Sequence, residues 1–224
     1  MEMNLVTFLG YVGLAASFIY LYLEFRQRTS MWLFSILCSV IYIVIFYTKQ
    51  LYADVAFSVF NICISVWGLM QWRKRDKAKA DGEGVIEYRV LGLRGWLQVL
   101  AVFAAVFGAL YAFLHFFTDS PVPGYDAFNT ALNIVGTWIL GRKVIEVWGV
   151  WFLANVASVF LYAMRSNVDG ALYESLSDCM PHWVAYVMAQ DMLSSVFLYG
   201  IYTLASVYGF FQWSRRGVRI GAEG

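Results

Sequence analysis

The sequence predicts an all-α polytopic membrane protein with seven transmembrane helices. The chain of 224 residues is 61% hydrophobic and only 14% charged, whereas a soluble domain is typically about 45–50% apolar and about 25% charged. Its apolar residues form seven runs, and each run, once extended by neighbouring polar residues, approaches the roughly 20 residues that a helix needs to span a bilayer. An internal repeat, described below, predicts how these helices are grouped.

The seven apolar runs follow one another along the chain. Strands are not expected in them, because an open sheet leaves backbone groups unsatisfied in lipid and the runs do not alternate strictly. The first run is read as an anchor and not as a cleaved signal peptide, because an acidic segment precedes it and a basic segment follows it. The runs are Leu5–Leu23, Met31–Tyr47, Ala53–Met70, Trp96–Phe117, Phe128–Leu140, Val147–Ala163 and Met192–Trp213.

Basic residues are divided unevenly between the two sets of loops. Fourteen of the sixteen Lys and Arg residues follow odd-numbered runs, and the opposite loops hold only Lys49 and Arg165. Cytoplasmic loops carry the Lys/Arg excess, so we expect the N-terminus outside and the C-terminus in the cytoplasm. The net charge of +1 provides no strong field for nucleic acid, which is not expected as a partner.

Two segments of the chain repeat. Ser65–Arg75 and Ser206–Arg216 are identical at six of eleven positions, at an offset of 141 residues, and share the pattern Ser-Val-x-Gly-x-x-Gln-Trp. At an offset of 119, Trp32 aligns with Trp151, and Ser39-Val40 aligns with Ser158-Val159. The difference between the offsets places an insertion before the last run.

The repeat predicts a 3+1+3 arrangement with parallel copies, because both copies end on the same side. We expect a first three-helix repeat at residues 1–75, a cytoplasmic loop and linker helix at 76–124, and a second repeat at 125–224 with an external insertion at about 166–191. Such repeats are typical of transporters, whose substrate site lies near the midplane between the copies.

Two connecting segments have different expectations. The charged stretch 73–95 is predicted to be a solvated cytoplasmic loop. In the insertion, Ser177-Asp178 before Pro181 is typical of a helix start. Nothing from there to Trp213 breaks a helix, so either the last helix extends outward or a short helix lies on the surface before it.

The densest candidate site is on the sixth run. On a helix, Trp148, Trp151 and Asn155 lie within about 60° of one another. Two indoles and an amide suit a flat, polar heteroaromatic ligand, and the ring faces could also attract a cation. The alternative is that both indoles belong to an interfacial belt and that Asn155 bonds a neighbouring helix.

Amide side chains on two other runs extend this candidate site. Asn129 and Asn133 form a polar stripe with Thr137, and the third run offers Asn61. Such amides can also join helices, but the stripe favours a wet cavity. The candidate substrate-binding residues are therefore Trp148, Trp151, Asn155, Asn133, Asn129 and Asn61. By contrast, Trp72, Trp96 and Trp213 are interpreted as belt residues at the cytoplasmic boundary.

Enzyme and receptor functions are not favoured. The spans contain no His pair, carboxylate dyad or nucleophile–base set, and no glycine loop for a nucleotide, so no catalytic residue, metal or cofactor is predicted. The three cysteines are too scattered for a disulfide framework. A seven-helix sensor would need an output domain, and the cytoplasmic segments are too short to hold one.

The chain resembles the PnuC family of bacterial vitamin transporters. The resemblance is carried by Arg142-Lys143-x-x-Glu146 followed by Trp148, Trp151 and Asn155, by the Gly-x-x-Gln-Trp helix ends, and by the 3+1+3 arrangement. It covers nearly the whole chain and implies an arrangement similar to SWEET transporters, a homotrimer in the bacterial inner membrane, and a substrate site lined by the Trp/Asn motif.

The resemblance also implies a transport mode. It implies uptake of nicotinamide riboside by facilitated diffusion, with a cytoplasmic kinase that phosphorylates and traps the vitamin for pyridine nucleotide biosynthesis. Related members carry thiamine, riboflavin or deoxynucleosides. Thiamine is also a heteroaromatic cation and remains the alternative, because the external insertion departs from the shorter family pattern.

Overall fold

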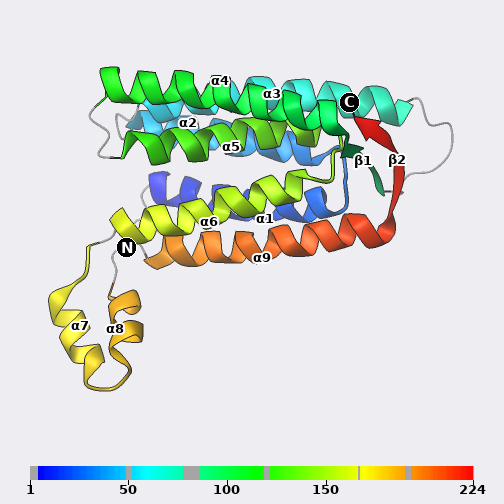
Figure 1. The fold of residues 1–224 in the computed structure, drawn as a ribbon. Coiled ribbons are helices and arrows are strands. Elements are labelled where there is room, and N and C mark those ends of the chain that lie inside the picture. Colours follow the sequence, from blue (N-terminus) through cyan, green and yellow to red (C-terminus); the bar gives the residue numbers. More distant parts are fainter. Residues whose placement is uncertain are drawn as a thin grey trace. The chain divides into compact units, whose positions relative to one another are not determined.

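A computed structural model describes residues 5–48, 52–77, 86–118, 122–165, 167–189 and 193–223. These residues form nine helices and two strands (Figure 1). In chain order the elements are α1 (Leu5–Phe25), α2 (Met31–Thr48), α3 (Tyr52–Lys77), β1 (Ile86–Leu91), α4 (Leu93–Phe117), α5 (Pro123–Gly141), α6 (Val147–Arg165), α7 (Gly170–Ser177), α8 (His182–Met188), α9 (Leu193–Arg216) and β2 (Gly217–Glu223).

The first six apolar runs lie within α1 to α6, and the seventh lies within α9 from Leu193 onward, since its first residue is outside the described residues. The expected extension by polar residues is confirmed, since α3 continues to Lys77 and α5 begins at Pro123. Proline at the first helical position fits, because its missing N–H would have no intrahelical acceptor there. By length and composition, two of the described helices are long and apolar enough to cross a membrane, Met31–Thr48 and Leu93–Phe117.

The chain folds into two compact units, whose segments alternate along the sequence. Unit 1 contains Met1–Gly92, Thr137–Ile145 and Phe211–Gly224, and unit 2 contains Leu93–Gly136 and Glu146–Phe210. Unit 1 therefore holds α1 to α3, both strands and the last turns of α5 and α9. Unit 2 holds α4, α6 to α8 and the remaining parts of α5 and α9.

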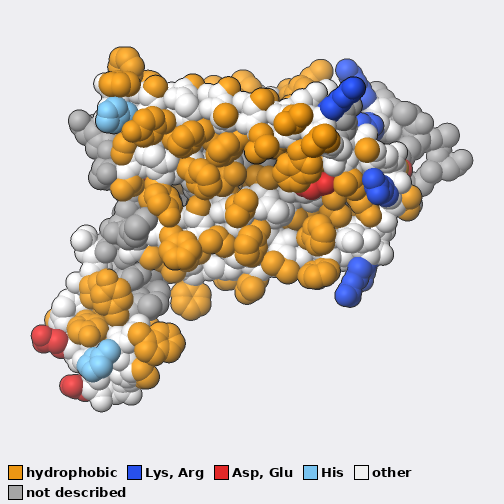
Figure 2. Space-filling view, viewed as in Figure 1, with side chains coloured by type: hydrophobic (Ala, Val, Ile, Leu, Met, Phe, Trp, Pro, Cys, Tyr) orange, Lys and Arg blue, Asp and Glu red, His pale blue; other side chains and the backbone are white. Residues whose placement is uncertain are grey.

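Helix α4 in unit 2 exposes most of its apolar surface. Leu93, Phe116 and Phe117 are 80%, 73% and 78% exposed, and hydrophobic side chains follow the visible face of the helix (Figure 2). Water would solvate such a surface poorly, whereas lipid chains match it. Its exposed face is that of a helix surrounded by lipid.

The turns after α1 and α5 have the same backbone form. Each contains a non-glycine residue in the left-handed region, Gln27 with φ 52° and Lys143 with φ 61°. Both residues lie four positions before the next helix, which starts at Met31 or Val147. Residues 27 and 143 are 116 positions apart, so the chain builds this turn twice at that spacing.

This spacing corrects the alignment of the second and sixth runs. It matches Trp32 with Trp148, and each of these indoles packs on the corresponding glycine of its unit, Gly68 or Gly209. The predicted match of Trp32 with Trp151 is wrong by about one helical turn. The periodicity of a helix explains the error, because a slip of three residues keeps the same face aligned.

A small parallel sheet adds to the mostly helical fold and corrects the solvated-loop prediction at 86–91, while residues 78–85 of that stretch lie outside the described residues. Strand β1 lies within 73–95 and pairs with β2, from Ile86 opposite Gly217 to Leu91 opposite Glu223, with an irregularity between Tyr88 and Arg89. β1 also binds both turns of unit 1. The Gln27 side chain exchanges two hydrogen bonds with the Glu87 backbone, at 2.7 and 2.9 Å.

The second turn binds β1 through the backbone. The Arg89 N–H donates to the Lys143 carbonyl at 2.9 Å, and the Ile145 N–H donates to the Arg89 carbonyl at 3.0 Å. These partners are distant in sequence, so the local sequence of 73–95 was not enough to predict the strand. A segment that looked like a connector instead joins the two turns of unit 1.

In unit 2, two short helices precede the last helix. α7 starts at an N-cap, Asp169, whose carboxylate accepts a hydrogen bond from the Leu172 N–H at 3.1 Å. α8 follows Pro181 and packs against α7 as a hairpin (Figure 1). A separate short helix before the last one is therefore confirmed, but Ser177-Asp178, predicted to start it, instead end α7, which was not expected.

Candidate functional site

Helix α6 carries the central candidate residues of unit 2 on two neighbouring faces. Trp148 and Asn155, seven residues apart, contact α9. Trp151 and Ser158, with the same spacing, contact α5. Two such stripes are expected on one helix when residues three and four positions apart alternate between two neighbouring helices.

The face toward α9 combines an indole with an amide. The Trp148 ring, 1% exposed, lies so close to Gly209 that a Cβ there would overlap it. Asn155 lies two turns after Trp148 on α6, and Ser206 lies one turn before Gly209 on α9. Asn155 Nδ2 donates to Ser206 Oγ at 3.2 Å, and Ser206 Oγ donates to the Tyr202 carbonyl at 2.8 Å. The glycine gives the ring room, and the serine holds the amide.

The face toward α5 has the same composition. The Trp151 ring lies over Gly136, and Asn129 Nδ2 donates to Ser158 Oγ at 2.9 Å. Asn133 Nδ2 donates to the Asn129 carbonyl at 2.8 Å, one turn below on its own helix. Asn129 Oδ1 is buried, and it has no hydrogen-bond partner within the described residues. This oxygen could accept a hydrogen bond from a ligand or from water.

Asn61 belongs to unit 1, whereas the other five candidates belong to unit 2. Its Nδ2 donates to Ser39 Oγ at 3.0 Å, and Ser39 Oγ donates to the Ser35 carbonyl at 2.9 Å. Ser35 and Ser65 share a further hydrogen bond at 2.8 Å. These contacts join α2 to α3, which is the alternative role of such amides in membrane helices.

The chemistry of this arrangement is that of recognition. In unit 2, α6 and α5 bring together two indoles and three amides, groups that can stack on a flat ring and exchange hydrogen bonds with its substituents. Trp151, Asn155, Asn129 and Asn133 are only partly buried, whereas Trp148 is fully enclosed. Trp148 therefore already has a packing partner, and its ring would have to share or leave that contact to touch a ligand.

The repeated motif is visible in the sequence, but the structural roles of its serines and glycines are not. Ser65 and Ser206 hold polar side chains of a neighbouring helix, and Gly68 and Gly209 receive indoles. The signal was the identity of the motif itself, since unrelated helix ends would not share small residues at fixed positions.

The tryptophans of the motif correct the belt interpretation. Trp72 is fully buried in unit 1, and its Nε1 donates to the Leu140 and Gly141 carbonyls at the end of α5, at 3.2 and 3.1 Å. Trp213 is equally buried, and its Nε1 donates to the Glu24 carbonyl near the end of α1 at 3.3 Å. The last carbonyls of a helix have no intrahelical donors, so both indoles cap helices. Trp96, 42% exposed, keeps the exposure of a belt residue.

Comparisons with known proteins place this geometry in a family of transporters. Residues 7–215 match the family model described as "Nicotinamide mononucleotide transporter". The chain is 22% identical over 192 residues to the nicotinamide riboside transporter PnuC of Neisseria mucosa, covering 85% of this chain and 65% of that protein, less than two thirds of its length. It is 25% identical over 178 residues to PnuC of Escherichia coli, covering 69% of this chain and 73% of that protein.

A solved structure shares the fold. The crystal structure described as the vitamin B3 transporter PnuC superposes with a TM-score of 0.64, covering 93% of this chain and 81% of that chain at 19% sequence identity.

Proposed function

The chain belongs to the nicotinamide mononucleotide transporter family, which makes it a membrane transport protein, and we propose that it takes up nicotinamide riboside by facilitated diffusion. The observation that carries the proposal is the family match over residues 7–215, together with the stacking and amide groups of α5 and α6. Nicotinamide riboside has a flat cationic ring and a polar ribose, and these groups complement aromatic faces and amides.

The proposed substrate site consists of Trp148, Trp151, Asn155, Asn133 and Asn129 in unit 2, whereas the hydrogen bond of Asn61 to Ser39 gives that candidate amide a helix-joining role in unit 1. The partial exposure of Trp151 and Asn155 and the buried oxygen of Asn129 support it. Trp151 would stack on the nicotinamide ring, and the amides would bind its carboxamide or the ribose hydroxyls. Trp148 would act by closing the helix interface behind Trp151 or by shifting onto the ligand.

The proposed transport mode needs no motor of its own. No glycine loop for a nucleotide occurs in the sequence, so substrate would equilibrate across the inner membrane and be trapped by a cytoplasmic kinase. The architecture proposed for this activity is seven transmembrane helices in a 3+1+3 parallel repeat. We place the N-terminus outside and the C-terminus in the cytoplasm, with three copies in a homotrimer. The repeated turn and the repeated Gly–Trp contacts support the repeat.

Two measurements test the function. Calorimetry on purified protein with nicotinamide riboside, thiamine, riboflavin and a deoxynucleoside should give heat of binding for nicotinamide riboside; tighter binding of thiamine would replace the proposed substrate. In sealed proteoliposomes, labelled nicotinamide riboside should reach the external concentration and stop there. Accumulation above that level, abolished by a protonophore, would replace facilitated diffusion with ion-coupled transport.

A further inference from the structure

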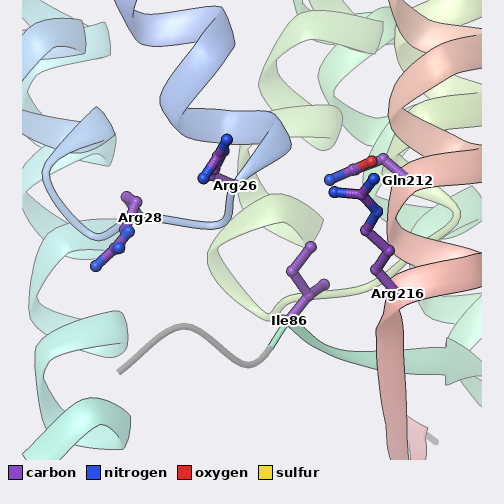
Figure 3. Close-up of a pocket in the computed structure, with 5 residues that line it drawn as sticks. All are labelled: Arg26, Arg28, Ile86, Gln212 and Arg216. Carbon is purple, nitrogen blue, oxygen red and sulfur yellow. The ribbon is translucent and has the colours of Figure 1, made fainter. Parts of the chain in front are cut away.

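Unit 1 contains a cavity of about 190 Å³ lined mainly by basic side chains (Figure 3). Arg26 and Arg28 come from the turn that follows α1, Gln212 and Arg216 from α9, and Ile86 from the start of β1. Gln212 and Arg216 lie side by side and point toward Arg26 across the cavity. The volume leaves room for more than one water molecule.

Within the described part of the chain, the three guanidinium groups bring positive charge together and no carboxylate lines the cavity. Within the described residues, none of Arg26, Arg28 and Arg216 forms an ion pair, and the only charge-related contact of Arg26 is its position 5.2 Å from the Tyr22 ring centroid. Like charges around a shared hollow repel one another. An anion in the cavity would remove that repulsion.

The walls of the cavity are fixed by buried contacts. Gln27, between the two arginines of the turn, is held to β1 by its two hydrogen bonds with Glu87. Trp213, next to Gln212, is held to the end of α1 by its bond to the Glu24 carbonyl. The arginines therefore project from backbone that is already in place, which reduces the entropy lost when they close on a ligand.

The repeat provides an internal comparison, because Arg75, the residue equivalent to Arg216, is engaged by the protein itself. Arg142 and Arg75 occupy the positions of Arg26 and Arg216 at the spacings of 116 and 141 residues. Arg142 stacks on Trp138 at 4.1 Å, as Arg26 does on Tyr22. Arg75 Nη1 donates to the Arg142 carbonyl at 2.8 Å, whereas Arg216 lines the cavity. The Lys/Arg excess of cytoplasmic loops would account for an arginine at both positions, but it does not explain why Arg75 is hydrogen-bonded and Arg216 lines a cavity.

We propose that Arg26, Arg28, Arg216 and Gln212 form a binding site for a phosphate group. Guanidinium forks match the oxygens of phosphate in pairs, and charge-assisted hydrogen bonds of this kind are stronger than neutral ones. The Gln212 amide adds a donor that is polar without being charged. Phosphate oxygens of this kind occur in the headgroup of an anionic lipid and in a soluble phosphate ester. The site is separate from the proposed substrate site and does not depend on the transport proposal.

The experiment uses two probes on the full chain. In neutral detergent, the thermal unfolding midpoint is measured against inorganic phosphate at constant ionic strength with chloride as reference. In nanodiscs, native mass spectrometry counts phosphatidylglycerol retained from a mixture with phosphatidylcholine. We expect the responding probe to bind at least about tenfold more weakly to Arg216→Gln and Arg28→Gln, because each loses a charge-assisted pair. A response to phosphate identifies a soluble ligand, and a response to phosphatidylglycerol alone identifies a lipid.

Arg215→Gln is the matched control. It removes the same charge at the adjacent position, where the guanidinium lies 5.4 Å from the Phe211 ring and does not line the cavity. This variant should bind both probes as the wild type does. Equal losses in Arg215→Gln and in the two cavity variants would overturn the proposal in favour of diffuse charge. Failure of the wild type to respond to either probe would overturn it outright.

Discussion

Tryptophan rings lie against glycine backbones at four places, two in each unit. The pairs are Trp32 with Gly68, Trp67 with Gly141, Trp151 with Gly136, and Trp148 with Gly209. In lipid, helices gain little from burying apolar surface, so their association depends on close packing and on small residues that permit it. The glycines therefore determine how closely the neighbouring helices approach.

Gly209→Ala should destabilise the protein by about 1–3 kcal/mol, the usual cost of overpacking. A Cβ at this position would overlap the fully buried Trp148 ring, which has no space to retreat into. The midpoint of thermal unfolding in detergent measures the effect. Gly200→Ala is the control on the same helix, because a Cβ there meets no atom within 4 Å. It should be neutral or stabilise by up to about 1 kcal/mol. Equal midpoints for the two variants would show that the Trp148 contact is not tight.

Trp151→Ala and Asn155→Ala should each weaken binding of nicotinamide riboside by about tenfold or more. Loss of an aromatic stack on a base costs roughly 1–3 kcal/mol, and an unpaired polar group on the ligand costs a similar amount. Calorimetry measures the affinity, and the unfolding midpoint verifies that each variant is folded, since Asn155 also bonds Ser206.

The control for this pair is Trp96→Ala. Trp96 is 42% exposed at the start of α4, whereas Trp72, another tryptophan at a boundary, is buried and caps α5. Trp96→Ala should bind like the wild type. If Trp151→Ala and Asn155→Ala also do so, the substrate site lies elsewhere and both side chains serve only helix packing.

Among the elements, the helices could be predicted from the sequence, whereas the strands could not. Apolar runs that are long enough to span a bilayer determine a helix locally, because each backbone bond closes within four residues. Strand β1 depends on Gln27, on the turn 143–145 and on β2, all remote in sequence. Its pattern Ile86-Glu87-Tyr88-Arg89-Val90 does alternate, but five residues of alternation between charged neighbours also fit a loop.

Only part of the candidate site could be predicted from the sequence. Helical spacing predicted one shared face for Trp148, Trp151 and Asn155, but Trp148 and Asn155 contact α9 whereas Trp151 contacts α5. The spacing could not assign Trp148 to α9 and Trp151 to α5, because the partner glycines lie on other helices. The arginine cavity was beyond sequence reasoning for the same reason, since its residues come from three separate elements.

Gln27→Ala should loosen strand β1. The variant keeps a non-glycine residue in the left-handed turn but loses both hydrogen bonds to Glu87, each worth about 0.5–1.5 kcal/mol net. Hydrogen exchange at the amides of Ile86–Leu91 should therefore accelerate roughly tenfold, as followed by mass spectrometry. Gln98→Ala, at an exposed position of α4, should leave that exchange unchanged. Unchanged exchange in Gln27→Ala would mean that pairing with β2 alone holds the strand.

For the whole molecule, the distribution of charge predicts its orientation. With fourteen of sixteen basic residues on one side, an impermeant thiol reagent applied outside whole cells should label a cysteine placed at Met3 and not one placed at Ala222. Serine replaces Cys38, Cys63 and Cys179 in the background, because two of them are exposed. External labelling of both test positions would refute the proposed topology.

Trp213 and strand β2 also impose an order on biosynthesis. The carbonyl of Glu24 near the end of α1 and the hydrogen-bonding edge of β1 are made early, but their partners leave the ribosome after every other helix has been synthesised. Until then, the nascent chain presents an unpaired strand edge and an α1 end without its indole cap. Unit 1 can therefore reach its final form only after translation of residues 211–223, and a chain released before that point would keep β1 and the end of α1 without these partners.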